Sequence, residues 1–168
     1  MKYIQSLLIS FLISSFIFSQ VDLSIENVTD NSLDIVMSNS VDVGGFQFGL
    51  DGVSITGASG GSATSNGFTL STNSSLVLGF SLTGGTIPSG SGTLVNVAYS
   101  GTPEEICLAG VVLSDQSGSS LDVNVGDCWS APEIISGCTD SNACNFNEEA
   151  EVDDGSCSYT EDCEGICG

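Results

Sequence analysis

The stretch GFQFGLD, residues 45–51, decides the fold class, because its large apolar side chains fall on every second residue. In an extended strand successive side chains point to opposite faces, so Phe46, Phe48 and Leu50 would share one face and Gln47 the other. An alternating run of this kind predicts a strand with one face in a hydrophobic core and one face in solvent.

The rest of residues 21–130 has the same character, with short β-branched and aromatic runs separated by clusters of Gly, Ser and Asn. Apolar residues do not recur there at the 3.6-residue spacing of a helix. We expect nine strands, at residues 21–27, 32–38, 45–51, 53–58, 67–72, 75–82, 92–100, 106–114 and 121–126. Strands with one apolar face pack as two sheets, which predicts an all-β, nine-strand antiparallel β-sandwich (jelly roll) with a small disulfide-rich C-terminal appendage.

The alternation also predicts which side chains form the core. In residues 32–38, the buried face would carry Leu33, Ile35 and Met37. In residues 75–82, the same rule assigns one face to Leu76, Leu78, Phe80 and Leu82, and the opposite face to Val77, Gly79 and Ser81. The run LVNVAY, residues 94–99, is apolar on both faces, which is typical of a central strand.

Four glycine-containing and apolar motifs follow one another between residues 45 and 99. They are the GFQFGL strand, the Asp51-Gly52 turn, the apolar run 76–82 and the strand GTLVNVAY. This order resembles a cohesin-type domain, which implies a nine-strand jelly roll related to carbohydrate-binding modules. Cohesins of cellulose-degrading assemblies hold dockerins that are carried by enzymes. This chain has no duplicated calcium loop of the dockerin type, so we expect any dockerin to lie on another polypeptide.

Residues 1–19 have the layout of a secretory signal peptide, with Lys2 followed by an apolar, serine-containing run of about 15 residues. A membrane-spanning helix needs about 20 apolar residues, so an uncleaved anchor is the weaker alternative. We expect cleavage after Ser19, secretion to the outside of the cell or its surface, and no membrane insertion of the mature chain.

The charge balance excludes several classes of partner. The chain has 21 Asp and Glu residues, one Lys or Arg residue and no His, for a formal net charge of −20. Nucleic acids are excluded as partners, because their phosphates require basic side chains. The carboxylates repel one another without internal ion pairs, so bound divalent cations or a salt-rich marine habitat would suit the chain.

Seven cysteines in an exported chain predict disulfides, and the odd number leaves at least one without an intrachain partner. The disulfide candidates are Cys107, Cys128, Cys138, Cys144, Cys157, Cys163 and Cys167. We expect Cys107 to pair with Cys128 at the C-terminal edge of the sandwich, with separate pairings to the tail cysteines as the alternative. The chain stops within a cysteine pattern, so we expect it to continue beyond Gly168.

We expect the sandwich to span residues 20–129 and a linker to span residues 130–136. Residues 137–168 then form a cysteine- and Asp-rich unit, too small for a core of its own. Their cysteine spacing matches no zinc knuckle and they lack His. Calcium prefers oxygen ligands, and the candidates are Asp140, Asn142, Asn145, Asn147, Asp153 and Asp154. The alternative is a solvated acidic loop in which Asn and Asp form turns.

The segment GCTDSNACNFNEEAEVDDGSC, residues 137–157, fills every fixed position of the pattern GCTDxxACN(Y/F)N…DDGSC. It resembles a thrombospondin type 3-like repeat of large secreted proteins from marine bacteria. The resemblance implies a disulfide-bonded repeat with a composition suited to calcium.

Without His or Arg, and with the single Lys in the signal peptide, the mature chain cannot build a Ser-His-Asp or Cys-His arrangement, so we expect no enzyme. The favoured function is a secreted, non-catalytic module for adhesion or protein scaffolding, with a calcium-binding spacer. The alternative is a carbohydrate-binding module of a polysaccharide-degrading system. Sugar recognition uses exposed aromatic residues, and the sandwich offers few, Tyr99 and Trp129, which counts against this alternative. The partner would be an extracellular protein or a polysaccharide.

Overall fold

The computed structural model describes residues 20–160, which form two compact units that divide between Trp129 and Ser130. The expected signal peptide and two disulfide candidates, Cys163 and Cys167, lie outside the described residues. Within residues 20–160, no helix has the length and apolar character needed to cross a membrane.

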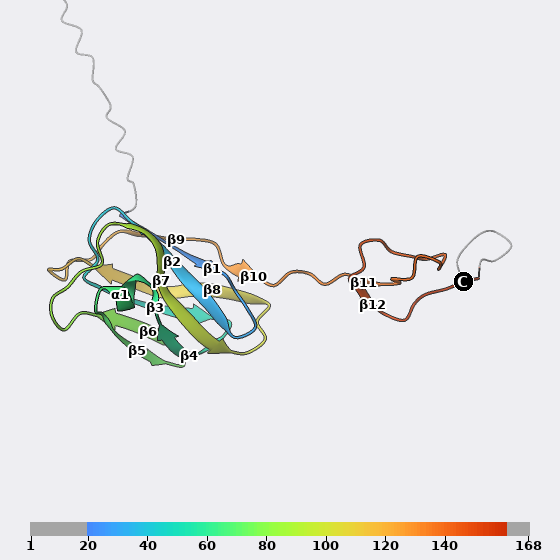
Figure 1. The fold of residues 1–168 in the computed structure, drawn as a ribbon, viewed down its shortest axis with the longest axis horizontal. Coiled ribbons are helices and arrows are strands. Elements are labelled where there is room, and N and C mark those ends of the chain that lie inside the picture. The colour runs from blue at the N-terminus through green and yellow to red at the C-terminus, as the bar shows by residue number, and fades with distance from the viewer. Residues whose placement is uncertain (1–19, 161–168) are drawn as a thin grey trace, which may run out of the picture. The chain divides into compact units, whose positions relative to one another are not determined.

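The first unit is a sandwich of two five-stranded sheets (Figure 1). One sheet has the order β4-β7-β2-β1-β9 and the other β10-β8-β3-β6-β5. The elements are β1 (Val21–Glu26), β2 (Ser32–Asn39), β3 (Gly45–Asp51), β4 (Ser54–Ser59), α1 (Gly61–Ser65), β5 (Thr69–Asn73), β6 (Leu76–Phe80), β7 (Gly90–Ser100), β8 (Glu105–Ser114), β9 (Val123–Val125) and β10 (Trp129–Ser130). Each of the nine expected strands is present, and the β-sandwich is confirmed. The pairings among β1 to β9 are antiparallel except that of β1 with β9, which is parallel.

Two short elements were not expected from the sequence. The helix α1 lies in the Gly- and Ser-rich segment between β4 and β5, and it is too short to show a helical period. Its last turn is held by side chains, since Asn66 Nδ2 donates to the Ser62 carbonyl (2.7 Å) and Ser65 Oγ to the Gly61 carbonyl (3.0 Å). The strand β10 pairs with the edge of β8.

The core lies between the two sheets and follows the alternation of β2 and β3. Phe46, Phe48 and Leu50 are buried, as are the three predicted residues of β2, Leu33, Ile35 and Met37. The Phe46 ring stacks against Phe48 and Phe68, with ring centroids 6.1 and 6.0 Å apart. Burial of each such side chain contributes about 1.5–3 kcal/mol, so these two strands supply much of the stability of the sandwich.

The predicted orientation of β6 is wrong. Val77 is fully buried and Gly79 faces the core, whereas Leu78 is 36% exposed and Leu82, beyond the strand, is 79% exposed. The reason lies across the sheet, where Gly79 pairs directly with Phe46. A Cβ atom on Gly79 would lie 2.2 Å from the Phe46 ring, so the ring occupies the space that the glycine leaves.

The strand β7 is apolar on both faces for a local reason. A register shift in its pairing with β2, between Ile35 and Val36, brings both Leu94 and Val95 into the core. Tyr99 is 4% exposed, and its hydroxyl donates to the Thr29 carbonyl. Burial, with Asp30 nearby, raises the pKa of Tyr99. Tyr99 is therefore a core residue, and the expectation that it is exposed is wrong.

A disulfide closes the C-terminal edge of the sandwich. Cys107 of β8 bonds to Cys128, the pairing that the sequence favoured, and β10 follows directly. Trp129 packs against the core. The disulfide thus holds the end of the sandwich beside β8.

The second unit, from Ser130, contains little regular structure. The strands β11 (Ser136–Gly137) and β12 (Val152–Asp153) form a two-residue parallel pair, and the Cys138–Cys157 disulfide lies beside it. Within residues 130–160, the buried apolar residues are Cys138 and Ala143. Cys144 is also disulfide-bonded. Cross-links and turns, rather than a core, hold this unit together.

Candidate functional site

The outer face of the β8-β3-β6-β5 part of the second sheet carries a continuous set of apolar and small polar side chains. The register places Val112, Gln47, Leu78 and Ser71 in one row across four strands, since each pairs with the next. Because directly paired residues share a face, these side chains form one strip of surface. Val112 is 49% and Leu78 36% exposed, so the strip has an apolar, solvent-facing part.

A second row beside the first is formed by Ser114, Gly45, Phe80 and Thr69. Between the rows lies a shallow hollow of about 290 Å³, lined by residues of β3, β6 and β8. Gly45 lies in the second row and carries no side chain, which leaves the face low at this position. The unexpected outward orientation of Leu78 and Phe80 is thus what makes this face apolar.

No charged residue lies on this face between the ends of its strands. Its outer positions are Thr69, Ser71, Asn73, Leu76, Leu78, Phe80, Gly45, Gln47, Ala109, Val112 and Ser114. Carboxylates border it, with Asp51 and Glu105 at one end of β3 and β8 and Asp115 at the other. Hydrogen bonds from Ser117 and Ser119 lower the pKa of Asp115, which keeps it ionised. An uncharged face bordered by carboxylates is unusual in a chain this acidic. We call this surface the β8-β3-β6-β5 face.

The outer face of the other sheet is different, because it carries carboxylates bound by amides. Asn124 Nδ2 donates to Asp22 Oδ1 (3.0 Å), and Asn27 Nδ2 donates to Asp34 Oδ2 (2.8 Å). Asn96 donates to the second oxygen of Asp34. Because residues 20–160 contain no Lys, Arg or His, asparagine amides satisfy these carboxylates and leave the sheet polar.

The described residues contain one close group of three potential metal ligands, Glu105, Cys107 and Cys128. Cys107 and Cys128 are bonded to each other, so their sulfurs are not thiolates. A single carboxylate remains, and it does not make a metal centre.

Asp140, the first of the predicted calcium ligands, is held by its neighbours. Its Oδ1 accepts from the backbone and side-chain nitrogens of Asn142, both at 2.9 Å, and its Oδ2 accepts from the Tyr159 hydroxyl at 2.7 Å. The Asn142 backbone N–H, then Tyr159, lower the pKa of Asp140, while the bond to Asp140 raises the pKa of Tyr159. Sequence reasoning missed Tyr159, since it lies beyond the repeat pattern.

Two of the remaining predicted ligands, Asn145 and Asn147, make hydrogen bonds within the unit. Asn145 Nδ2 donates to the Ser156 carbonyl (2.7 Å), and its Oδ1 accepts from the Ser158 N–H (2.8 Å). Asn147 Oδ1 accepts from the Glu149 N–H (3.1 Å). Asn145 therefore ties the two halves of the unit together.

Asp153 Oδ1 and Asp154 Oδ1 accept from the Gly155 and Ser156 N–H groups, at 3.1 and 2.9 Å. The bonds from Ser156 lower the pKa of Asp154. The charge of Asp153 is the smallest of the causes that raise the pKa of Tyr159, after the bond to Asp140. Tyr159 is thus hydrogen-bonded to Asp140, and among the described residues the predicted ligands Asp140, Asp153 and Asp154 do not form a close group.

Solved structures that resemble this fold include cohesins. In a type I cohesin–dockerin complex from Clostridium thermocellum, the matching chain has 13% identity and a TM-score of 0.49, over 65% of this chain and 90% of that one. A non-cellulosomal cohesin from the archaeon Archaeoglobus fulgidus has 18% identity and a TM-score of 0.48, over 64% and 86%.

The sixth cohesin of scaffoldin B from Acetivibrio cellulolyticus, solved with a dockerin, has 17% identity and a TM-score of 0.47, over 64% and 95%. No family model matches the sequence, and no curated protein matches it.

Proposed function

We propose that the chain is an extracellular, non-catalytic scaffolding module that binds a protein partner through the β8-β3-β6-β5 face. The observation that carries the proposal is the row Val112–Gln47–Leu78, apolar at both ends and exposed, on the uncharged face of a strongly acidic chain. Interface centres are depleted of charge and enriched in apolar side chains, as this row is.

The acidic rim specifies the chemistry of the partner. Asp51, Glu105 and Asp115 border the face, so a partner with an apolar centre and Lys or Arg around it would be complementary. A second copy of the chain would bring its own carboxylates to the same rim, and like charges across an interface are costly. The partner is therefore a different, basic-rimmed protein, and a dockerin is the first probe to use.

The first prediction concerns the apolar row. Leu78→Asp is expected to weaken binding of a purified type I dockerin by tenfold or more, because a buried, unpaired carboxylate would replace an apolar contact. Isothermal titration calorimetry with a panel of dockerins measures the change. Ser38→Asp is the matched control, since Ser38 is an exposed strand residue on the other sheet.

The variant Asp115→Asn tests the contribution of the acidic rim. It should make the affinity for the dockerin less dependent on salt concentration, while the affinity at high salt should change little. Equal binding by Leu78→Asp and the wild type would show that this face is not the interface. Failure of every dockerin in the panel to bind would remove the dockerin class as a partner.

We propose further that residues 130–160 act as a spacer whose carboxylates take up calcium outside the cell. The support is chemical, since residues 130–160 offer many carboxylate and amide oxygens and contain no Lys, Arg or His. The carboxylates already accept hydrogen bonds within their turns, so calcium must compete with these bonds. We therefore expect the weak calcium affinity of extracellular modules, with a dissociation constant of about 0.1–1 mM.

The second prediction tests this metal proposal. Millimolar calcium should slow proteolysis within residues 130–160 and a chelator should reverse the effect, whereas sodium chloride of equal ionic strength should not reproduce it. The double variant Asp140→Asn/Asp153→Asn should lose the response. The variant Asp22→Asn is the control, because Asp22 lies on the sandwich. Identical protease resistance with calcium and with chelator would leave disulfides alone as the stabilising element.

A further inference from the structure

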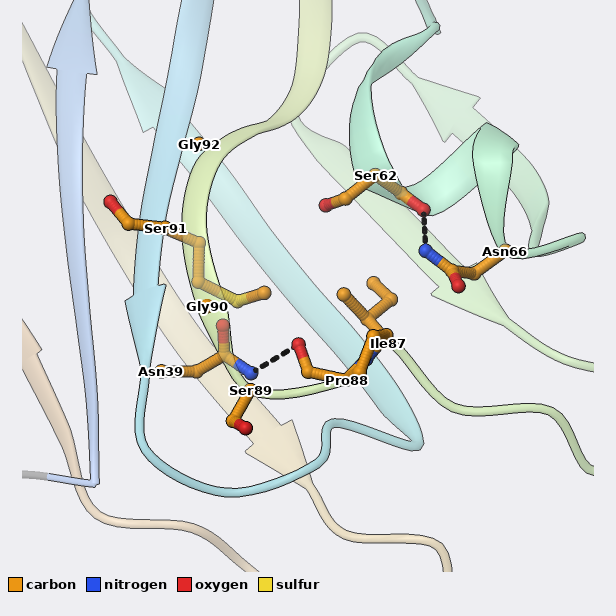
Figure 2. Close-up of a pocket in the computed structure, with 10 residues that line it drawn as sticks. Asn39, Ser62, Asn66, Ile87, Pro88, Ser89, Gly90, Ser91 and Gly92 are labelled. Atoms are coloured by element: carbon orange, nitrogen blue, oxygen red, sulfur yellow. Dashed lines mark hydrogen bonds between the residues drawn. The ribbon is translucent and has the colours of Figure 1, made fainter.

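A pocket distinct from the β8-β3-β6-β5 face lies where β2 ends and β7 begins (Figure 2). Its volume is about 190 Å³, and it is lined by the last residues of β2, by α1 and its C-cap, and by residues 87–92. Ligand pockets for drug-sized molecules have volumes of about 300–1,000 Å³, so this one has room for a single small ring.

The pocket exists because two inward positions of β7 lack side chains. Gly90 pairs with Asn39 and Gly92 with Met37, and both partners point into the sandwich. Directly paired residues share a face, so side chains at 90 and 92 would also point inward. A Cβ atom on either glycine would meet no atom of a non-adjacent residue within 4 Å. These glycines leave open a space that a core residue would fill.

A buried polar group is directed into this space. Asn39 is 7% exposed, and its Nδ2 donates both hydrogens, to the Val41 carbonyl (2.8 Å) and the Pro88 carbonyl (3.1 Å). No donor among the described residues reaches its Oδ1, and Figure 2 shows that oxygen directed toward Gly90. No buried side-chain nitrogen or oxygen among the described residues lacks a partner, so Oδ1 is open to the pocket rather than enclosed. The two bonds of Nδ2 fix the amide, and Oδ1 is therefore an oriented acceptor for a donor in the pocket.

The remaining lining is polar but uncharged on one side and apolar on the other. Figure 2 shows the Ser62 hydroxyl leaving α1 toward the strand that carries Gly90 and Gly92. Met37, Ile87 and Pro88 supply the apolar part of the wall. Hydroxyl and amide groups opposite aliphatic carbons suit a ligand that has both O–H donors and a C–H face.

We propose that this pocket binds one pyranose unit of a neutral sugar. A pyranose ring carries hydroxyl donors for Asn39 Oδ1 and Ser62 Oγ, and C–H groups for Ile87 and Met37. The ligand is neutral, because no lining residue is basic and the chain is strongly acidic. The site is separate from the proposed protein-binding face, so either proposal can fail without the other.

The third prediction tests the pocket on the full-length secreted chain by saturation-transfer NMR, with methyl glucoside, galactoside, mannoside and xyloside as probes. At least one probe should bind saturably, with a dissociation constant on the order of 1 mM. Methyl glucuronide should bind at least tenfold more weakly than methyl glucoside if the glucoside is the ligand. A trisaccharide that ends in the preferred unit is compared with the methyl glycoside. A site for the end of a glycan binds both, whereas a site for the free sugar binds the methyl glycoside alone.

Gly90→Leu is expected to abolish binding, because its side chain would occupy the pocket without strain, and its melting temperature should not fall. Ser62→Ala should weaken binding several-fold without filling the space. Leu78→Asp and Ser38→Val should bind the sugar as the wild type does. Absence of saturable binding for all four glycosides, or unchanged binding by Gly90→Leu, would overturn the proposal.

Discussion

Gly79→Val is expected to lower the free energy of unfolding of the sandwich by about 3 kcal/mol or more. Overpacking a core typically costs 1–3 kcal/mol, and here the first added atom already lies 2.2 Å from Phe46 Cζ. The Phe46 ring is 2% exposed and stacks against Phe48 and Phe68, so it has no free direction in which to move. Chemical denaturation monitored by far-UV circular dichroism measures the change.

Gly90→Ala is the matched control, because Gly90 is also an inward-facing strand glycine but has open space around its Cβ position. Replacing a strand glycine with alanine gains about 0.5–1 kcal/mol where the space allows it, so this variant should be slightly more stable. Phe46→Leu should restore part of the stability lost in Gly79→Val, as a double-mutant cycle would show. Equal stabilities for Gly79→Val and Gly90→Ala would contradict the packing of Phe46 against Gly79.

The strands of the sandwich could be predicted from the sequence because their signal is local. Phe46, Phe48 and Leu50 alternate within one segment, and the burial of that strand follows from the segment itself. The orientation of β6 could not be predicted in this way, since its own apolar residues favour the wrong face. What decides it is the pairing of Gly79 with a phenylalanine more than thirty residues away, which no single-strand pattern contains.

The same distinction applies to the candidate sites. The β8-β3-β6-β5 face depends on the outward orientation of Leu78. Because the sequence predicted the opposite orientation for β6, it did not predict this apolar face. The pocket depends on Gly90 and Gly92 lying opposite Asn39 and Met37, in two strands that β3 to β6 separate in the sequence. In the second unit, the Asn and Asp residues were recognised as ligand or turn residues, but the partnership of Asp140 with Tyr159 required the fold.

Loss of the Cys138–Cys157 disulfide is expected to unfold residues 130–160 while the sandwich stays folded. Within that segment, the strands β11 and β12 pair over two residues each, and the buried apolar residues are Cys138 and Ala143. Such a unit has no core to replace the cross-link. The bond closes a loop with a sequence separation of 19, and in the chain-entropy model a loop of this size contributes about 3 kcal/mol.

The variant Cys138→Ser/Cys157→Ser tests this, with hydrogen exchange followed by mass spectrometry as the measurement. Amides of residues 135–158 should lose protection, including the Asn147 N–H, which donates to the Cys138 carbonyl, whereas β2, β3 and β7 should keep theirs. Cys107→Ala/Cys128→Ala is the comparison, because it removes a bond of similar loop length from a unit with a large core. That variant should lower the stability of the sandwich but leave it folded. Retained protection of residues 135–158 without their disulfide would show that the turn hydrogen bonds of Asn145 and Asp140 are sufficient to hold the unit.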